Sequence, residues 1–187
     1  MIRIPALPAA LCLLLASCVA TGGTPDERRS HIDGRTQDVL SRLYDDEVPA
    51  SRKQVEGAAG FAVFSNKGVD LFFVGGGGGY GVAVDNDSGD RTYMRMGEAG
   101  VGIGLGVKDF RVVFVFEDRD RLETFIREGW DVGVDATAAA SLEGEGAEAS
   151  AVASFQDGIA AYQLTETGLA LRANLKGTKY WAYTELN

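Results

Sequence analysis

The chain has 187 residues, 45% of them hydrophobic, and a formal net charge of −9, which suits one domain with a real hydrophobic core. A net acidic protein is a poor non-specific binder of nucleic acid, because phosphate binding depends on clustered Lys and Arg. The 25 glycines cluster and do not recur at every third position, which excludes a collagen-like chain.

The start of the chain has the pattern of a secretory signal. Arg3 gives a positive first segment, and residues 6–15 form an apolar stretch that is too short to span a bilayer. The segment Leu14-Leu15-Ala16-Ser17-Cys18 resembles the lipobox of a bacterial lipoprotein. We therefore predict that residues 1–17 are removed as a signal peptide and that the sulfur of Cys18 carries a diacylglycerol. An ordinary cleaved signal peptide, with an incidental Cys18, is the alternative.

The predicted lipidation has consequences for location and chemistry. Val19 follows the cysteine where inner-membrane lipoproteins have Asp, so we expect export across the inner membrane and anchoring at the outer membrane, facing the periplasm. Cys12 leaves with the signal peptide and Cys18 carries the lipid, so no thiol remains for a disulfide, a metal cluster or nucleophilic catalysis. The expected partners are membrane lipids, reached through the Cys18 anchor, together with a lipid bound by the domain; no nucleic acid is expected. The sequence names no protein partner.

Residues 18–30 are small and polar and predict a flexible, lipidated tether. Apolar residues fall on one helical face over 31–47, which predicts an amphipathic helix that Pro49 ends. Ser51 then has the character of an N-cap for a short helix that continues through Ala58.

Strand patterns begin at Phe61 and dominate the rest of the chain. Residues 65–68 predict a hairpin turn between two apolar runs, and residues 86–90 predict a second turn. Asp118 and Gly129 have the character of caps at the two ends of a helix near 118–128. Strands are predicted at residues 61–64, 69–74, 80–84, 91–96, 101–107, 110–116, 132–134, 151–155, 159–164 and 169–175.

Many short strands and few helices predict an α+β fold that is predominantly antiparallel β. We expect one domain over 31–187, with a sandwich or a barrel-like sheet, because no boundary and no solenoid repeat interrupt this range. The strand at 110–116 is a nearly continuous apolar run, which predicts a central position in the sheet.

The order of these features resembles the SYLF, or Ysc84-type, domain family over most of residues 32–187. Membership implies a lipid-binding module, with phosphoinositide recognition in eukaryotic relatives and actin binding in some fungal ones. This chain is acidic, whereas phosphoinositide recognition needs a dense basic patch, and an envelope compartment contains no actin. We therefore carry over lipid binding as a class. The matching pieces are Ala59 to Phe64, Gly75 to Gly81, Gly100 to Gly106, Val112 to Phe116, the helix with Leu122 and Phe125, Gly133 to Ala136, and Gly168-Leu169.

Two glycine-rich segments are candidate ligand contacts. The five-glycine run 75–79 lacks the Gly-Lys-Ser/Thr of a phosphate-binding loop and favours a strand that bends at a corner of the sheet, with a lipid groove as the alternative. In the alternating segment 101–107, Gly102, Gly104 and Gly106 leave one face bare. Either the helix at 31–47 presses on that face, or an acyl chain lies there.

Basic and aromatic residues supply headgroup candidates. Arg91, Tyr93 and Arg95 share one face of a strand, and Arg52 with Lys53 begins the second helix, near the region the family uses for membrane contact. Each basic pair is equally compatible with a solvated surface. Tyr180, Trp181 and Tyr183 have the character of interfacial aromatics, although burial of at least one is expected. The basic pairs are Arg52 and Lys53, Arg91 and Arg95, Arg119 and Arg121, and Lys176 and Lys179.

The sequence offers little for catalysis. His31 is the single histidine and lies in the predicted tether or first helix, so no Ser-His-Asp set is available. No metal-ligand spacing and no cofactor motif occur, so we expect neither a metal nor another cofactor. The sequence favours a non-catalytic, membrane-anchored module of the bacterial envelope that binds lipid or another amphiphile. The alternative is a structural or protein-interaction lipoprotein with no lipid ligand beyond its own anchor.

Overall fold

The computed structural model describes residues 23–72, 74–100, 104–131, 158–165, 168–169 and 178–187. The predicted signal peptide, Cys18, Gly102 and the strands predicted at 132–134 and 151–155 lie outside these residues. None of the described helices is long and apolar enough to cross a bilayer.

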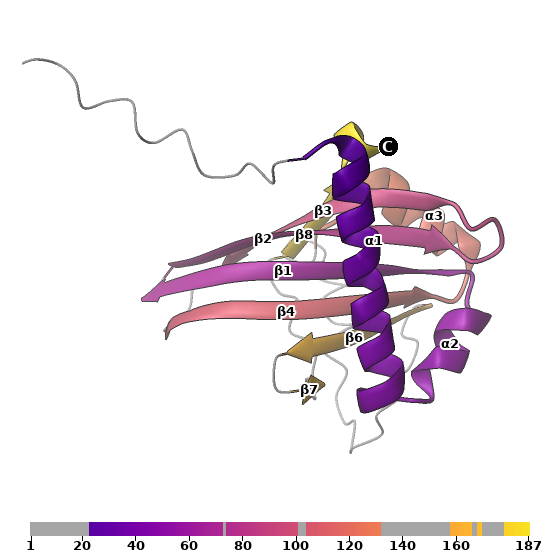
Figure 1. Cartoon of the computed structure of the whole chain (residues 1–187), viewed down its shortest axis with the longest axis horizontal. Helices are drawn as coiled ribbons and strands as arrows, with labels where there is room; N and C mark the ends of the chain where they lie inside the picture. Colours follow the sequence, from indigo (N-terminus) through magenta and orange to yellow (C-terminus); the bar gives the residue numbers. More distant parts are fainter. Residues whose placement is uncertain (1–22, 73, 101–103, 132–157, 166–167, 170–177) are drawn as a thin grey trace, which may run out of the picture.

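The described strands form one antiparallel sheet, in the order β5-β8-β3-β2-β1-β4-β6-β7 (Figure 1). All neighbouring pairs of these strands are antiparallel, and the described parts of β5 and β7, at the two ends of this order, have two residues each. The bounds are β1 Gly60–Phe72, β2 Val74–Asp85, β3 Arg91–Gly100, β4 Gly104–Phe116, β5 Trp130–Asp131, β6 Ile159–Thr165, β7 Gly168–Leu169 and β8 Thr178–Ala182.

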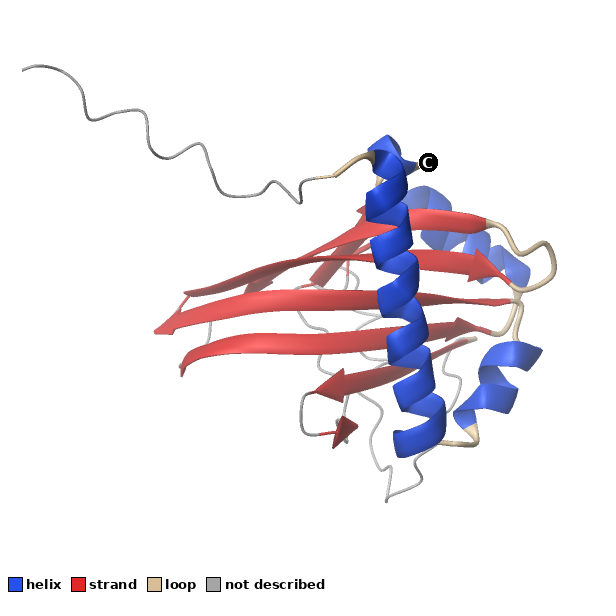
Figure 2. Ribbon diagram, viewed as in Figure 1, coloured by secondary structure: helices blue, strands red, loops and turns tan. Residues whose placement is uncertain are grey.

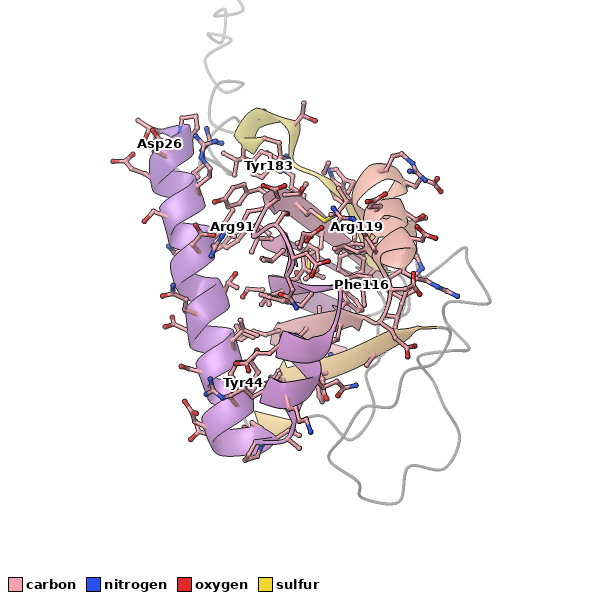
Figure 3. The ribbon with its side chains drawn as sticks, turned by 90° about the vertical axis from the view of Figure 1, so that its right-hand side faces the viewer. Asp26, Tyr44, Arg91, Phe116, Arg119 and Tyr183 are labelled. Atoms are coloured by element: carbon pink, nitrogen blue, oxygen red, sulfur yellow. The ribbon has the colours of Figure 1, made fainter. Side chains whose placement is uncertain are left out.

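Helices cover both faces of this sheet (Figures 2 and 3). On one face lie α1 Pro25–Arg42, the π-helical turn η1 Leu43–Glu47 and α2 Ser51–Gly57; α3 Arg119–Glu128 lies on the other. A 3-10 turn, η2 Thr184–Leu186, ends the chain beside α1. The fold is therefore α+β and predominantly antiparallel β, as predicted, and the described strands form a single curled sheet and no sandwich of two sheets.

The alternation along β1 explains how one sheet serves two cores. Val63 packs with the α1 side, whereas Ala62 and Phe64 pack with the α3 side. Because both faces are covered, both sets of positions are apolar, and the strand has no simple polar alternation. The α3-side cluster is Ala62, Phe64, Ala83, Met94, Met96, Val112, Phe114, Phe116, Leu122, Phe125 and Tyr180.

The helix predicted at 31–47 begins earlier, at Pro25, so that residues 25–30 of the predicted tether are helical. A complete capping box explains the start: Glu27 N donates to Thr24 Oγ1, and Thr24 N donates to the Glu27 carboxylate. Ser51 is the first residue of α2 and not its N-cap. Its hydroxyl donates to the carbonyl of Val48 at 2.6 Å.

The hairpin turn predicted at 65–68 is wrong. β1 continues through these residues to Phe72, and its partner begins at Val74, with Leu71 and Val74 paired. The small and polar residues 65–68 resemble a turn, but β1 is paired with β2 on one side and β4 on the other throughout this range. Pairing on both sides overrides the local preference.

Other local predictions are confirmed. The turn at 86–90 joins β2 to β3. Residues 110–116 form the second half of β4, which has β1 on one side and β6 on the other and so has an internal position in the sheet. α3 has the predicted caps: Arg121 N donates to the Asp118 carboxylate, and Gly129 has a φ of 71°. A Cβ at Gly129 would lie 2.3 Å from the Tyr180 carbonyl oxygen, so glycine is needed there.

Candidate functional site

The predicted trio Arg91, Tyr93 and Arg95 lies on the α1 side of β3. The Arg91 guanidinium pairs with Asp33 Oδ1 at 2.6 Å, and the Tyr93 hydroxyl donates to Asp33 Oδ2 at 3.1 Å. Burial, followed by the hydrogen bond to Asp33, raises the pKa of Tyr93. Two of the three residues therefore join α1 to β3.

Arg95 has a different environment. Its guanidinium carbon lies 3.8 Å from the centre of the Tyr183 ring, and its ion pair with Glu185 is long, at 3.9 Å. From α1, Arg28 Nη1 donates to the Tyr183 hydroxyl at 2.8 Å and also reaches Glu185. Tyr183 is buried between these two arginines, whereas 44% of the Arg95 side chain is exposed.

The three aromatics near the end of the chain divide as expected between core and surface. Tyr180 and Tyr183 are buried, and Trp181 is the exposed large hydrophobic residue of the described chain, at 38% exposure. Trp181 is the register partner of Arg95, and a Cβ built on Gly97 would lie 3.2 Å from Trp181 Cη2. The bare backbone of Gly97 therefore gives the indole a place to lie.

We call Arg28, Arg95, Trp181, Tyr183 and Glu185 the aromatic corner. It lies at the N-terminal end of α1, where Tyr183 is drawn near Asp26 (Figure 3). Its partners are far apart in the sequence: Arg28 and Tyr183 are separated by 155 residues. The Asn187 side chain secures this end, because it both accepts from Tyr93 N and donates to Tyr93 O, at 2.8 and 2.9 Å.

The second predicted basic site, Arg52 and Lys53, lies at the opposite end of α1. Arg52 packs over the Tyr44 ring at 4.5 Å and pairs with Asp45 at 3.1 Å and Glu56 at 3.9 Å. We call Tyr44, Asp45, Arg52, Lys53 and Glu56 the distal patch. Burial, with a smaller contribution from Glu56, raises the pKa of Tyr44 to about 12.

The five-glycine run lies in a strand, as the sequence favoured. Gly75–Gly79 pairs with β1 on one side and with β3 on the other, so its backbone groups bond neighbouring strands and do not form a phosphate cradle. At Gly79 and Gly81 a Cβ would lie within 2.2 and 2.1 Å of carbonyl oxygens of β1. These two glycines are needed for close strand approach.

The prediction that the first helix presses on the glycine face of 101–107 is wrong. Successive residues of β4 point to opposite faces of the sheet, and Val113 and Val115 pack on the α1 side. Gly104 and Gly106 are an odd number of residues away from these valines, so they lie on the opposite face. Gly106 is also about 23 Å along β4 from Val113, which is one of the residues in the cluster on the α1 side. In Figure 1, β1, β2 and β4 extend beyond α1 at this end.

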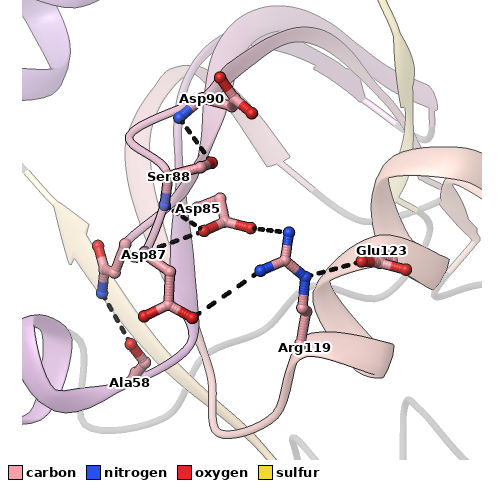
Figure 4. A network of polar contacts seen from close by, with 8 residues as sticks. Ala58, Asp85, Asp87, Ser88, Asp90, Arg119 and Glu123 are labelled. Carbon is pink, nitrogen blue, oxygen red and sulfur yellow. Dashed lines mark hydrogen bonds and ion pairs between the residues drawn. The ribbon is translucent and has the colours of Figure 1, made fainter.

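One polar network had no functional expectation attached to it. Asp85 accepts hydrogen bonds from the backbone of Asp87 and Ser88 and pairs with Arg119 at 3.0 Å, which in turn reaches Glu123 (Figure 4). The backbone hydrogen bond from Ser88 is the main cause of the lowered pKa of Asp85. The network joins the 86–90 turn to α3 and is structural. A carboxylate directly before an Asn-Asp-Ser-Gly turn is the signal that predicts it.

Comparisons with known proteins define the class. Residues 97–187 match the family described as "Ysc84: Las17-binding protein actin regulator". The chain is also 34% identical over 163 residues to "Beta cell expansion factor A" of Aeromonas veronii, an alignment that covers 87% of this chain and 60% of that relative. Through residues 97–187 the chain is assigned to the Ysc84, or SYLF, family. The family match starts within β3 and includes the part of the aromatic corner from residue 97 onward.

Proposed function

We propose that this protein is a non-catalytic module of the bacterial envelope, anchored by a lipid on Cys18, that binds lipid or another amphiphile. Membership of the Ysc84 family and the lipobox-like segment before Cys18 support the proposal. The observation that carries it is the position of the fold relative to the anchor: α1 begins at Pro25, seven residues after Cys18. A lipid there would hold the folded chain close to a bilayer.

The start of α1 is compatible with processing at Cys18. The capping box of Thr24 and Glu27 satisfies the first N–H groups of the helix from within the chain that remains after cleavage. Removal of residues 1–17 therefore takes away no part of this cap. Two or more acyl chains are needed for a stable lipid anchor, which a lipoprotein modification supplies.

A binding role fits the chemistry of the described side chains better than catalysis does. His31 is exposed and shares a hydrogen bond of 2.7 Å with the Tyr80 hydroxyl, and the predicted basic residues Arg52, Arg91 and Arg95 each pair with a carboxylate. The actin named in the family description is not carried over, because an envelope protein meets no actin.

The anchor is tested by fractionation of cells that express the full-length protein or its Cys18→Ala variant. We expect the wild-type protein in the membrane fraction, releasable by detergent and not by high salt. The Cys18→Ala variant should lose the lipid-dependent membrane attachment. Equal, salt-resistant attachment of both forms would contradict the anchor.

Amphiphile binding is tested on the detergent-purified, full-length protein by native mass spectrometry and by extraction of co-purifying lipids. An unrelated lipoprotein prepared in the same detergent serves as the control. We expect at least one lipid retained beyond the covalent anchor. A folded protein that retains none, together with a protein partner found by crosslinking in cells, would support the structural or interaction alternative instead.

A further inference from the structure

The two basic sites lie at opposite ends of α1, and the position of Cys18 distinguishes them. α1 has 18 residues and is therefore about 27 Å long. Six residues lie between Cys18 and Pro25, and the seven steps from Cys18 to Pro25 span at most about 25 Å when fully extended. An anchor at Cys18 is therefore attached at the end of α1 that carries the aromatic corner, and the distal patch lies about one helix length farther along the molecule.

We propose that the aromatic corner is the surface with which the anchored domain lies on the phospholipid bilayer, with the Trp181 indole at the level of the headgroups and Arg95 bound to a lipid phosphate. This inference rests on the proposed Cys18 anchor. It adds an orientation of the domain and the residues that set it.

Trp181 has the exposure and support that this role requires. Its side chain is 38% exposed, and it lies over Gly97, where no side chain competes for the space. Tryptophan prefers the interface between headgroups and hydrocarbon because its ring is apolar and its N–H still reaches water. The indole is thus held against the sheet and presented on its surface.

Arg95 lies directly beside Trp181 and is oriented for a phosphate. Its guanidinium carbon lies 3.8 Å from the centre of the Tyr183 ring, and the long 3.9 Å pair with Glu185 leaves much of its hydrogen-bonding capacity unused. A planar guanidinium donates two parallel hydrogen bonds to a phosphate. Arg28 supplies a second positive charge behind Tyr183.

Each acidic residue at this end has a partner. Asp26 pairs with Arg29 at 2.6 Å, and the Glu27 carboxylate accepts from the backbone of Thr24 within the capping box. Within the aromatic corner one carboxylate, Glu185, is shared between two arginines, Arg28 and Arg95. The distal patch has the opposite ratio, because one arginine, Arg52, is shared between two carboxylates, Asp45 and Glu56.

The test uses the lipidated, full-length protein in vesicles of phosphatidylethanolamine and phosphatidylglycerol that carry bromine near the glycerol end of the acyl chains. Trp130→Phe leaves Trp181 as the single fluorescent reporter, and it preserves a ring where Trp130 contacts Phe114. The matched control carries Trp130→Phe, Trp181→Phe and Lys53→Trp, which moves the reporter to the distal patch. Circular dichroism verifies that both variants are folded.

We expect bromine to quench Trp181 at least about threefold more than the reporter at position 53, because bromine quenches only at short range and the two positions are separated by the length of α1. In the Trp181 reporter, Arg95→Gln should reduce the quenching. Equal quenching at both positions, stronger quenching at position 53, or none at either position in protein that floats with the vesicles would overturn the orientation and leave the anchor standing. Protein that does not float with the vesicles would contradict the proposed function itself, and the orientation with it.

Discussion

The two ends of α1 are attached to the sheet by different kinds of contact. At the aromatic corner the helix is bonded to a residue far away in the sequence, through Arg28 to Tyr183, and at its middle Asp33 bonds Arg91 and Tyr93. At the distal end, buried apolar side chains such as Leu43 and Val55 hold it, and the charged contacts are local. The first half of the helix thus combines long-range polar contacts with a small apolar cluster around Ile32, whereas the distal end depends on a larger hydrophobic core.

This difference matters for a membrane-bound domain. Apolar burial contributes most of the stability and has no directional requirement, so it suits the end away from the proposed bilayer contact. Hydrogen bonds and ion pairs set orientation more than they add stability. The polar contacts of the aromatic corner therefore orient its side chains Arg95 and Trp181, while apolar packing at the distal end holds α1 on the sheet.

The largest expected effect is at the distal end. Leu43 is fully buried in the cluster on the α1 side, so Leu43→Ala should lower the free energy of unfolding by about 2–5 kcal/mol through lost burial and a residual cavity. Urea denaturation measures the change. Gln37→Ala, at an exposed position of α1, is the control and should have almost no effect. Similar values for the two variants would contradict an apolar distal core.

A smaller effect is expected at the polar contacts in the middle of α1. Asp33→Ala removes the carboxylate that both Arg91 and Tyr93 use, which should cost about 1–2 kcal/mol and leave the Tyr93 hydroxyl without this partner. Unlike the effect of Leu43→Ala, this loss should shrink at high salt, because ions screen the partly exposed ion pair. Asp38→Ala, at an exposed position of the same helix, is the matched control. A loss of stability that is the same at low and high salt would contradict the ion pair as its cause and would indicate that Asp33→Ala acts through packing.

Titration of Tyr44 tests the burial of the distal end. The pKa of Tyr44 is raised to about 12 in the folded chain, above its ordinary value of 10.0, mainly by burial. Between pH 10 and about 12 the unfolded chain has lost this proton and the folded chain retains it, so stability should fall as pH rises through this window. Tyr44→Phe should flatten that part of the stability curve, measured by urea denaturation at several pH values. An unchanged curve would contradict the raised pKa.

The smallest effect is expected for the charges of the distal patch. About half of the Arg52 side chain is exposed, so Arg52→Gln should change the free energy of unfolding by less than about 1 kcal/mol. Lys53→Gln, at the neighbouring exposed position, should change it even less. Denaturation of both variants in parallel checks this ranking. A loss for Arg52→Gln as large as that for Asp33→Ala would remove the distinction between the two ends.

Local chemistry made several features predictable from the sequence. The Asp118 and Gly129 caps, the turn at 86–90 and the apolar run at 110–116 each have strong short-range signals, and all are present. The turn predicted at 65–68 failed because pairing of β1 on both sides outweighs turn composition. Of the two alternatives for the bare glycine face, contact with the first helix failed at Gly104 and Gly106, since which face a helix covers depends on tertiary packing.

The candidate site was predictable only in part. Period-two alternation placed Arg91, Tyr93 and Arg95 on one face of a strand. Their partners could not be found in this way, because Asp33 is 58 residues from Arg91 and no local pattern links the two. The aromatic corner depends on the chain end returning to the start of α1, which is a property of the sheet topology.

The most direct test of a membrane-anchored role is the intact mass of the protein purified from its native membrane. The lipid anchor predicts a polypeptide that starts at Cys18 and carries the added mass of a diacylglycerol and an amide-linked acyl chain. A polypeptide that retains residues 1–17, or an unmodified Cys18, would contradict it.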